Sequence, residues 1–219
     1  MSKVVIFGIG DYGRMASLYL AADSAHEVVG FAVDGAYHDR DELMGKPVMT
    51  FDTMVASHPP DRVSLLVAVG YSRLNQNRRE VYERCKKLGY SFITYINSRA
   101  YQWGHVEVGE NTFIFEANVL QPNVRIGDNC VLWSGNHIGH DSTIGSHVFI
   151  ASHVVISGNC RIGDSCFIGV NATFRDGVHV APRNLIGAGA VILKDTDEGD
   201  VYSVRRTEAR DFKSWDTKF

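Results

Sequence analysis

The sequence has no long apolar run and no strong excess of charge of either sign. No stretch approaches the roughly 18 consecutive apolar residues that a membrane-spanning helix needs. Its 22 Lys and Arg residues against 25 Asp and Glu residues give a net charge of −3, which lacks the basic footprint of a nucleic-acid-binding protein. The short apolar run at residues 4–7 passes into glycines and does not resemble a signal peptide. We therefore expect a cytoplasmic protein that engages neither a membrane nor nucleic acid.

Instead, a six-residue repeat organises the chain between residues 108 and 197. An aliphatic or aromatic anchor returns at every sixth position, and a residue that is usually small follows each anchor four places later. The anchors are Val108, Ile114, Leu120, Ile126, Leu132, Ile138, Ile144, Ile150, Ile156, Ile162, Ile168, Phe174, Val180, Ile186 and Ile192. A period of six fits neither an α-helix nor an alternating strand, and it is the signature of a parallel β-helix. Three hexads close one coil, so the repeat predicts about five coils in which residues 18 apart lie one above the other.

Cysteine is scarce, with four residues in the chain. Three of them, Cys130, Cys160 and Cys166, fall on the small inward position of the repeat. Cys130 and Cys166 lie two coils apart, roughly 10 Å at the spacing of neighbouring strands, which is too far for a disulfide. We therefore expect reduced cysteines that serve as packing residues.

Two pairs of asparagines are also spaced by one coil. Asn118 and Asn136 take the small inward position, which predicts a stacked amide pair inside the prism. Asn111 and Asn129 take turn positions, where asparagine tolerates a left-handed backbone. We interpret all four as fold signals without chemistry of their own.

A different pattern precedes the repeat. An apolar run over residues 3–8 enters the loop GIGDYG at residues 8–13, and a helical stretch and a strand over 28–33 follow and end at Asp34. Strand, glycine loop, helix, strand and acidic residue is the order of a mononucleotide-binding βαβ unit. The glycines let backbone N–H groups and a helix N-terminus approach a pyrophosphate, and Asp34 takes the position of a ribose-binding carboxylate. The structural alternative is a tight turn with close helix packing and no ligand.

The remaining pattern divides the chain into two domains. We expect a helix over 52–57, a strand over 65–69 that ends at Gly70, a helix over 75–88 and a fourth strand over 92–96. Residues 1–98 are then a small α/β domain with a Rossmann-like sheet, and residues 99–219 are the β-helix domain with a C-terminal tail. In the tail, Phe212, Trp215 and Phe219 share helical spacing and are expected to cover the open end of the β-helix, where strand edges lack partners.

The hexads and the preceding α/β domain together resemble the left-handed β-helix acyltransferases. The resemblance is to the two-domain branch of nucleotide-sugar N-acetyltransferases, which includes the bacillosamine-type enzyme, and it covers nearly the whole chain. It implies an acetyl-CoA-dependent acetyltransferase in surface polysaccharide biosynthesis, a homotrimer with active sites between subunits, and an acceptor such as a 4-amino-4,6-dideoxy sugar. In that branch the N-terminal domain holds the nucleotide sugar and not a nicotinamide. By this match the nucleotide-sugar residues are Gly8, Gly10, Gly13, Asp34 and Gly70.

The stretch NHIGHD at residues 136–141 is similar to the stretch that carries the catalytic histidine in this family. The resemblance makes His140 the general base that takes a proton from the acceptor. Gly158 lies 18 residues after His140, so a glycine N–H directly over the histidine suits the oxyanion of a tetrahedral intermediate. Asp141 could orient His140 only if the backbone turns at this corner, and otherwise it is a surface carboxylate.

The coenzyme site is expected on the later coils. The stretch GAGA at residues 187–190 looks like the coenzyme A segment of hexapeptide acetyltransferases. Gly187, Ala188 and Gly189 would leave room for the pantetheine arm, Asn159 would join them, and Lys194 would meet the phosphates. The chain departs from the bacillosamine-type pattern at Phe149, where that pattern has a second histidine. His147 and His153 flank this position, and either is a candidate substitute.

Three other functions remain open at this stage. A hydroxyl acceptor would make the protein an O-acetyltransferase. An inert prism would leave a nucleotide-binding or scaffold protein. A zinc hydratase of the γ-carbonic anhydrase type uses histidines between subunits, but no two histidines of this repeat are 18 apart, and we expect no metal.

Overall fold

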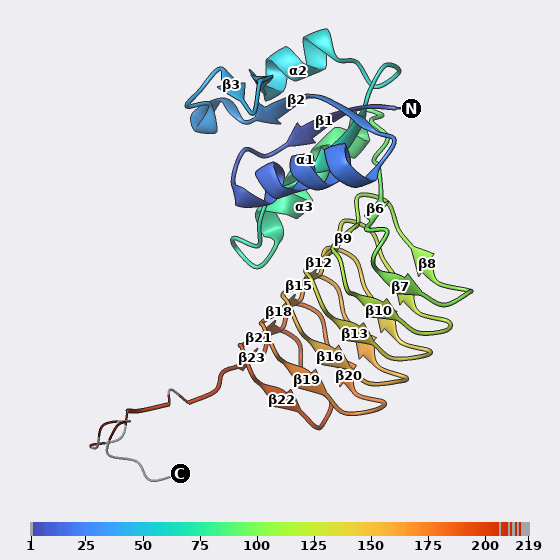
Figure 1. Cartoon of the computed structure of the whole chain (residues 1–219), viewed down its shortest axis with the longest axis vertical. Coiled ribbons are helices and arrows are strands. Elements are labelled where there is room, and N and C mark those ends of the chain that lie inside the picture. The colour runs from blue at the N-terminus through green and yellow to red at the C-terminus, as the bar shows by residue number, and fades with distance from the viewer. Residues whose placement is uncertain (1, 206, 210, 212, 214, 216–219) are drawn as a thin grey trace.

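The computed structural model describes residues 2–205, 207–209, 211, 213 and 215. An α/β domain lies on one end of a triangular β-helix, and a C-terminal tail leaves the opposite end (Figure 1). None of the helices in the described part of the chain is long and apolar enough to cross a bilayer.

The α/β domain is built on a five-stranded sheet with the strand order β3-β4-β2-β1-β5. The strands are β1 (Lys3–Phe7), β2 (Glu27–Val33), β3 (Glu42–Leu43), β4 (Lys46–Thr50) and β5 (Ser64–Val67). Only the β3–β4 pair is antiparallel. Three of the four strands expected from the sequence are present in this sheet, as β1, β2 and β5. The β3–β4 hairpin was not expected, because both strands are short. The turn between them is made by Met44 and Gly45, which have positive φ.

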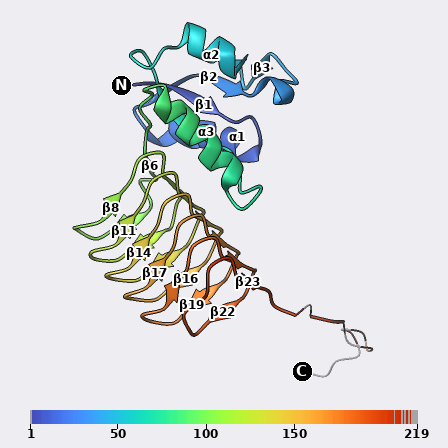
Figure 2. The ribbon, with the colours of Figure 1, turned by 180° about the vertical axis from the view of Figure 1, so that it is seen from behind.

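Three α-helices cover this sheet: α1 (Asp11–Asp23), α2 (Phe51–Ser57) and α3 (Gln76–Lys87). Alternate residues of β1 face opposite sides, as a strand requires. Val4 and Ile6 join a core with α1, whereas Val5 and Phe7 join a core with α2 and α3. The core on the α1 side also contains aromatic residues of the β-helix, so the two domains share apolar packing. Viewed from behind, α3 runs down toward the coils (Figure 2).

The β-helix has three parallel sheets, which we call the first, second and third sheets. The first sheet contains β6 (Tyr95–Ile96), β9 (Phe113–Ile114), β12 (Val131–Leu132), β15 (Phe149–Ile150), β18 (Phe167–Ile168), β21 (Leu185–Ile186) and β23 (Val201–Tyr202). The second contains β7 (Tyr101–Gln102), β10 (Val119–Leu120), β13 (His137–Ile138), β16 (Val155–Ile156), β19 (Thr173–Phe174) and β22 (Val191–Ile192). The third contains β8 (Glu107–Val108), β11 (Arg125–Ile126), β14 (Thr143–Ile144), β17 (Arg161–Ile162) and β20 (His179–Val180).

The predicted register is confirmed. His137, for example, lies opposite Val119 on one neighbouring strand and Val155 on the other, each 18 residues away. The anchors fill the interior as one apolar core. The three cysteines of the repeat are free and buried, as expected, and burial raises the pKa of Cys130 to about 12.

The β-helix begins earlier than the repeat indicates. The expected fourth strand over 92–96 is wrong as a strand of the α/β sheet, because only Phe92 bridges to Leu65, whereas β6 pairs with β9 of the first sheet. An additional coil therefore precedes residue 108. The hexad pattern of this coil is weak in the sequence because the polar Gln102 occupies an anchor position in β7.

Sharp corners separate the three sheets. Every sixth residue from His105 to Gly189 has a positive φ, including Asn111 and Asn129 as expected. Asn118 and Asn136 are buried one coil apart inside the prism, as predicted. Both side-chain amides donate to the carbonyl oxygen of Trp133.

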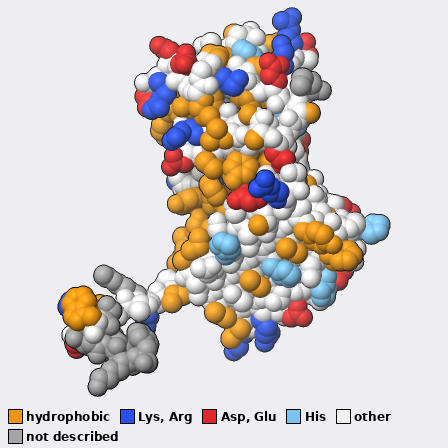
Figure 3. Space-filling model, viewed as in Figure 1, with side chains coloured by type: hydrophobic (Ala, Val, Ile, Leu, Met, Phe, Trp, Pro, Cys, Tyr) orange, Lys and Arg blue, Asp and Glu red, His pale blue; other side chains and the backbone are white. Residues whose placement is uncertain are grey.

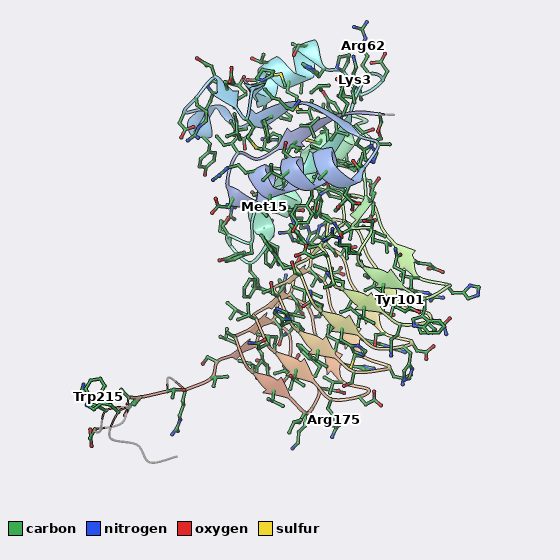
Figure 4. All side chains as sticks on the ribbon, in the orientation of Figure 1. Lys3, Met15, Arg62, Tyr101, Arg175 and Trp215 are labelled. Carbon is green, nitrogen blue, oxygen red and sulfur yellow. The ribbon has the colours of Figure 1, made fainter. Side chains whose placement is uncertain are left out.

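The described part of the C-terminal tail does not cover the open end of the β-helix. Trp215 is 80% exposed and lies away from the coils (Figure 4), so its expected role in covering the β-helix is wrong. Phe212 and Phe219 lie outside the described residues.

Candidate active site

A cavity of about 890 Å³ lies between the α/β domain and the β-helix. Four of the five residues expected at a nucleotide sugar line it: Gly8, Gly10, Asp34 and Gly70. Gly13 does not line the cavity. A Cβ on Gly13 would lie 2.1 Å from the carbonyl oxygen of Gly8, so this glycine is needed for close packing of α1 against the loop.

The glycine loop presents the start of α1 to the cavity. Gly8 has a φ of +129°, and a Cβ there would lie 2.4 Å from the carbonyl oxygen of Ala68, so only glycine fits. Gly10 precedes α1 as its N-cap without a side-chain cap, and a Cβ on Gly10 would meet nothing within 4 Å. The N–H groups of the first turn therefore have no capping side chain, and such a terminus attracts anions.

Asp34 is held by an arginine that the sequence did not reveal. Arg84 Nη2 donates to Asp34 Oδ1 at 2.6 Å. The guanidinium of Arg84 also lies 4.0 Å from the ring centroid of Phe51, a cation–π contact that fixes its plane. Asp34 and Arg84 both line the cavity, so they offer it an acceptor and a donor side by side.

The β-helix contributes an aromatic wall to the same cavity. Trp133 and Phe149 line it together with Tyr71 of the α/β domain. Phe149 is 4% exposed, and its ring centroid lies 5.0 Å from that of Tyr71. The residue at which the chain departs from the family pattern is therefore a packing residue of the first sheet.

Neither His147 nor His153 lies beside His140, where either would have to lie to replace the second histidine of the family pattern. His147 lies at the corner between the third and first sheets, and His153 lies at the corner between the first and second sheets. His147 is buried, its Nδ1 accepts from Asn129 Nδ2 at 2.9 Å, and burial lowers its pKa to about 4. Within one chain, neither histidine therefore shares the edge of the prism on which His140 lies.

A strained loop connects the cavity to the coils. Arg73, Leu74 and Asn75 have φ values of 51°, 51° and 67°, and three consecutive left-handed residues other than glycine persist only where their surroundings hold them. Asn75 is fully buried, and its Nδ2 donates to the carbonyl oxygen of Cys166 at 3.0 Å. The cavity rim at Gly70–Arg73 is therefore fixed to the β-helix.

Arg78 is the second link between the domains, and it is fully buried. Its Nη1 donates to Gly70 O at 3.2 Å and to Asn75 Oδ1 at 3.1 Å. Its Nε donates to Asn129 O at 3.2 Å, and its Nη2 donates to His147 O at 3.0 Å and to Val148 O at 3.4 Å. A guanidinium has five N–H groups, and all five have acceptors here. Burial lowers the pKa of Arg78 to about 10, so the group is still a cation at neutral pH.

His140 lies on a different edge of the prism, between the second and third sheets. Its neighbour Asp141 has a φ of 57°, so the backbone does turn at this corner. Asp141 Oδ2 lies 2.8 Å from His140 Nδ1, and Asn123 Nδ2 donates to Asp141 Oδ1 at 2.8 Å. The hydrogen bonds from Asn123 and His140 lower the pKa of Asp141. With Nδ1–H held by the carboxylate, Nε2 of the half-exposed His140 is left as a proton acceptor.

Gly158 lies next to the imidazole on the neighbouring coil, as the spacing predicted. A Cβ on Gly158 would lie 2.6 Å from His140 Nε2. Asn159 N donates to His140 O at 2.8 Å and aligns the two coils. The N–H of Gly158 has no hydrogen-bond partner among the described residues, so it is free to donate to a ligand.

The expected coenzyme residues fall into two groups. Asn159 and Lys194 follow strands of the second sheet and lie along the edge of His140. Gly187, Ala188 and Gly189 lie at the edge between the first and second sheets, where Gly189 makes the turn with a φ of 69°. A single chain therefore does not bring the two groups together.

The cavity and His140 are also separated within one chain. The cavity opens on the first sheet, through Trp133 and Phe149. The edge of His140 is the one formed by the other two sheets, so it lies opposite the first sheet across the prism. No group of three His, Cys, Asp or Glu side chains suited to a metal ion occurs within the part of the chain that the structure describes.

An α/β domain with an open glycine loop, placed on a hexad-built prism, defines a two-domain left-handed β-helix protein. The family model for "Bacterial transferase hexapeptide (six repeats)" matches the coils at residues 105–139, 123–158 and 159–194. The bifunctional protein GlmU of Clostridium beijerinckii is 33% identical over 120 residues, which are 54% of this chain and 23% of that protein. The chain thus spans about a quarter of the length of that relative.

Solved structures share both domains. The acetyltransferase domain of PglB from Neisseria gonorrhoeae, in complex with acetyl coenzyme A, matches with a TM-score of 0.79 and 25% identity over 91% of this chain and 95% of that chain. PerB from Caulobacter crescentus, in complex with CoA and GDP-perosamine, matches with a TM-score of 0.78 and 23% identity over 93% of each chain. The fold expected from the sequence is therefore confirmed.

Proposed function

We propose that this protein is an acetyl-CoA-dependent N-acetyltransferase that acts on a nucleotide-linked amino sugar. One observation carries the proposal: the chain combines a glycine-loop cavity of nucleotide size with a histidine whose Nε2 is free over a glycine N–H. The folds of the acetyl-CoA-bound PglB domain and of PerB support the same function. The acceptor is of the 4-amino-4,6-dideoxy class, and the reaction belongs to cytoplasmic synthesis of surface polysaccharide.

The cavity holds the nucleotide end of the acceptor. The diphosphate lies on the glycine loop, where Gly8 and Gly10 allow close approach and the N-terminus of α1 supplies N–H groups. Asp34 accepts from the ribose hydroxyls, and Arg84 holds the carboxylate in place. The sugar then points along the wall of Tyr71, Trp133 and Phe149.

The chemistry is direct attack of the acceptor nitrogen on the thioester carbonyl, without a covalent enzyme intermediate. His140 Nε2 takes a proton from the acceptor, and Asp141 stabilises the resulting imidazolium through Nδ1. Gly158 N–H donates to the oxyanion of the tetrahedral intermediate. Collapse of the intermediate breaks the carbon–sulfur bond, and the thiolate of coenzyme A leaves and takes up a proton.

The complete site needs a second copy of the chain. Because the cavity and His140 lie on opposite sides of one prism, the sugar held by one copy meets His140 of another in a homotrimer. Acetyl-CoA lies between copies, with Asn159 and Lys194 from one and Gly187–Gly189 from the other. The second sheet supports such packing: Tyr101, Val155 and Val191 point outward and are 55%, 40% and 61% exposed. Figure 3 shows hydrophobic side chains scattered over this face among the histidines.

Release of free coenzyme A thiol tests the proposal. The protein is mixed with acetyl-CoA and a panel of UDP-, dTDP- and GDP-linked amino sugars, together with their hydroxyl counterparts. We expect rapid release with one amino sugar, loss of release in His140→Ala, and normal release in His179→Ala, which removes an exposed histidine of the third sheet. Silence across the whole panel would refute the proposal and favour a protein that only binds a nucleotide. Release that survives His140→Ala would remove that residue as the base.

A further inference from the structure

Two side chains, not one, converge over Gly158. The position that a Cβ on Gly158 would occupy lies 2.6 Å from His140 Nε2 and 3.0 Å from Asp176 Oδ1. His140 follows a strand on one side of this coil and Asp176 follows a strand on the other, each 18 residues from Gly158. The imidazole therefore leans over the glycine from one neighbouring coil, and the carboxylate leans over it from the other.

The carboxylate of Asp176 has no structural partner that explains this placement. It is exposed, and it makes no ion pair or side-chain hydrogen bond within the described part of the chain. Asp141 differs, because both of its carboxylate oxygens have partners in Asn123 and His140. An unpaired carboxylate that faces the proton-accepting nitrogen of His140 is suited to a cationic ligand group.

We propose that Asp176 binds the ammonium group of the acceptor and makes the site selective for an amine over a hydroxyl. This inference rests on the proposed acetyltransferase function and deepens it. An amino sugar arrives largely as R–NH3⁺ at neutral pH, and the notch over Gly158 receives that group between a proton acceptor and a counter-ion. The chain's own geometry thus distinguishes the two acceptor classes that the sequence left open.

The chemistry balances with the groups present. The ammonium loses one proton to His140 Nε2, and the neutral nitrogen attacks the acetyl thioester. The nitrogen of the resulting tetrahedral intermediate again carries a positive charge, opposite the oxyanion at Gly158 N–H. Asp176 stabilises the nitrogen in both charged forms. The nitrogen gives its second proton to the departing thiolate, and His140 passes the first proton to solvent. The products are the amide and coenzyme A as the free thiol.

A hydroxyl acceptor would not benefit from the same arrangement. A hydroxyl oxygen brings no positive charge to neutralise Asp176, so the oxyanion would develop near an unneutralised carboxylate. Like charges at close range repel each other, and this repulsion raises the energy of the transition state. The carboxylate therefore favours amines and disfavours hydroxyls at the same time.

Steady-state kinetics of Asp176→Asn test the inference. The variant keeps the size of the side chain and removes its charge. A charge-assisted hydrogen bond contributes about 1.5–3 kcal/mol, so we expect the KM for the amino sugar to rise about 10- to 100-fold while the KM for acetyl-CoA stays unchanged. For the wild-type protein we expect the lowest KM at pH values where the acceptor is an ammonium ion. In Asp176→Asn we expect the KM to fall as the pH rises through the pKa of the amine.

Glu107→Gln is the matched control, since it removes one exposed negative charge from the first coils of the third sheet. It should leave both KM values unchanged, and both variants should unfold at the wild-type temperature. An unchanged KM and pH profile in Asp176→Asn would overturn the inference. So would a rise confined to the KM for acetyl-CoA, which would assign Asp176 to the pantetheine arm. A wild-type protein that transfers acetyl groups to no acceptor would instead refute the proposed function itself.

Discussion

Replacement of Arg78 by Met should destabilise the protein far more than any surface change of equal size. The substitution keeps an unbranched apolar stem but removes five N–H donors from a fully buried site. The carbonyl oxygens of Gly70, Asn129 and His147 would each lose a hydrogen bond, and no backbone N–H among the described residues replaces it. A buried acceptor left without a donor costs about 1–3 kcal/mol.

The three carbonyl groups set the scale of the expected effect. Three buried acceptors left without a donor, with partial relaxation around them, predict a loss of about 3–5 kcal/mol. For a chain of this length each kcal/mol shifts Tm by about 2–4 °C, so Arg78→Met should lower Tm by about 10 °C. Because Arg78 also holds the rim of the cavity at Gly70, binding of a nucleoside diphosphate should weaken in parallel.

The neighbouring residue provides the control. Arg79 carries the same charge one position later, is 42% exposed and pairs with Glu83 along the helix. An exposed pair of this kind contributes below about 1 kcal/mol, so Arg79→Gln should change Tm by no more than a few degrees. Differential scanning fluorimetry of both variants decides the matter. If Arg78→Met and Arg79→Gln melt together, the guanidinium does not join the two domains as described.

Two further predictions concern His147 and Gly158. Burial is the main reason that the pKa of His147 is lowered from 6.5 to about 4. As the pH falls, the unfolded chain therefore takes up this proton before the native state does. The native state loses stability as the pH falls from about 6.5 toward 4. His147→Asn keeps a residue that tolerates the left-handed turn. In urea titrations at several pH values, the free energy of unfolding of this variant should fall less toward pH 4 than that of the wild type, whereas His179→Asn should behave like the wild type. Equal pH profiles for His147→Asn and wild type would contradict the assignment. Gly158→Ala places a Cβ 2.6 Å from His140 Nε2, and displacement of the base by about 1 Å should slow acetyl transfer about 100-fold without a change in Tm. Gly104→Ala, where a Cβ meets nothing, should retain full activity, and an active Gly158→Ala would show that the imidazole does not work from this position.

The β-helix could be predicted from the sequence because its rules are local and periodic. The anchors repeat every six residues, each coil repeats every 18, and the corners recur at every sixth residue with positive φ. The same rule placed Gly158 over His140 without any knowledge of the structure. Its one failure was the first coil, where Gln102 interrupts the apolar series.

The links between the domains could not be predicted in the same way. Arg78 and Asn75 bind carbonyl groups 51 to 91 residues away, and a carbonyl acceptor leaves no trace in the sequence. A partial signal did exist, since Arg78 shares the helical spacing of the buried residues Val81, Tyr82 and Cys85, whereas Arg79 does not. Two adjacent arginines otherwise look alike, and only tertiary packing decides which one is buried.

The site was predicted in parts but not as a whole. The glycine loop and the histidine corner follow from short motifs, and both have the expected local geometry. Their separation on opposite sides of the prism depends on which sheet the α/β domain covers, and no motif encodes that choice. Asp176 was missed for a related reason, because it faces His140 only through the gap that Gly158 leaves between two coils.

The most direct test of the account is complementation between two inactive variants. Gly10 lines the cavity and a Cβ there meets nothing within 4 Å, so Gly10→Trp places an indole in the cavity. His140→Ala removes the base from the opposite edge. Each variant alone should be inactive. Mixed trimers can be obtained by co-expression with two affinity tags. Whichever variant is present twice, one of the three sites joins an intact cavity to an intact His140 of the next copy. Mixed trimers should therefore recover about one third of the wild-type rate. Mixed assemblies that fold and associate but release no coenzyme A would contradict a site shared between copies.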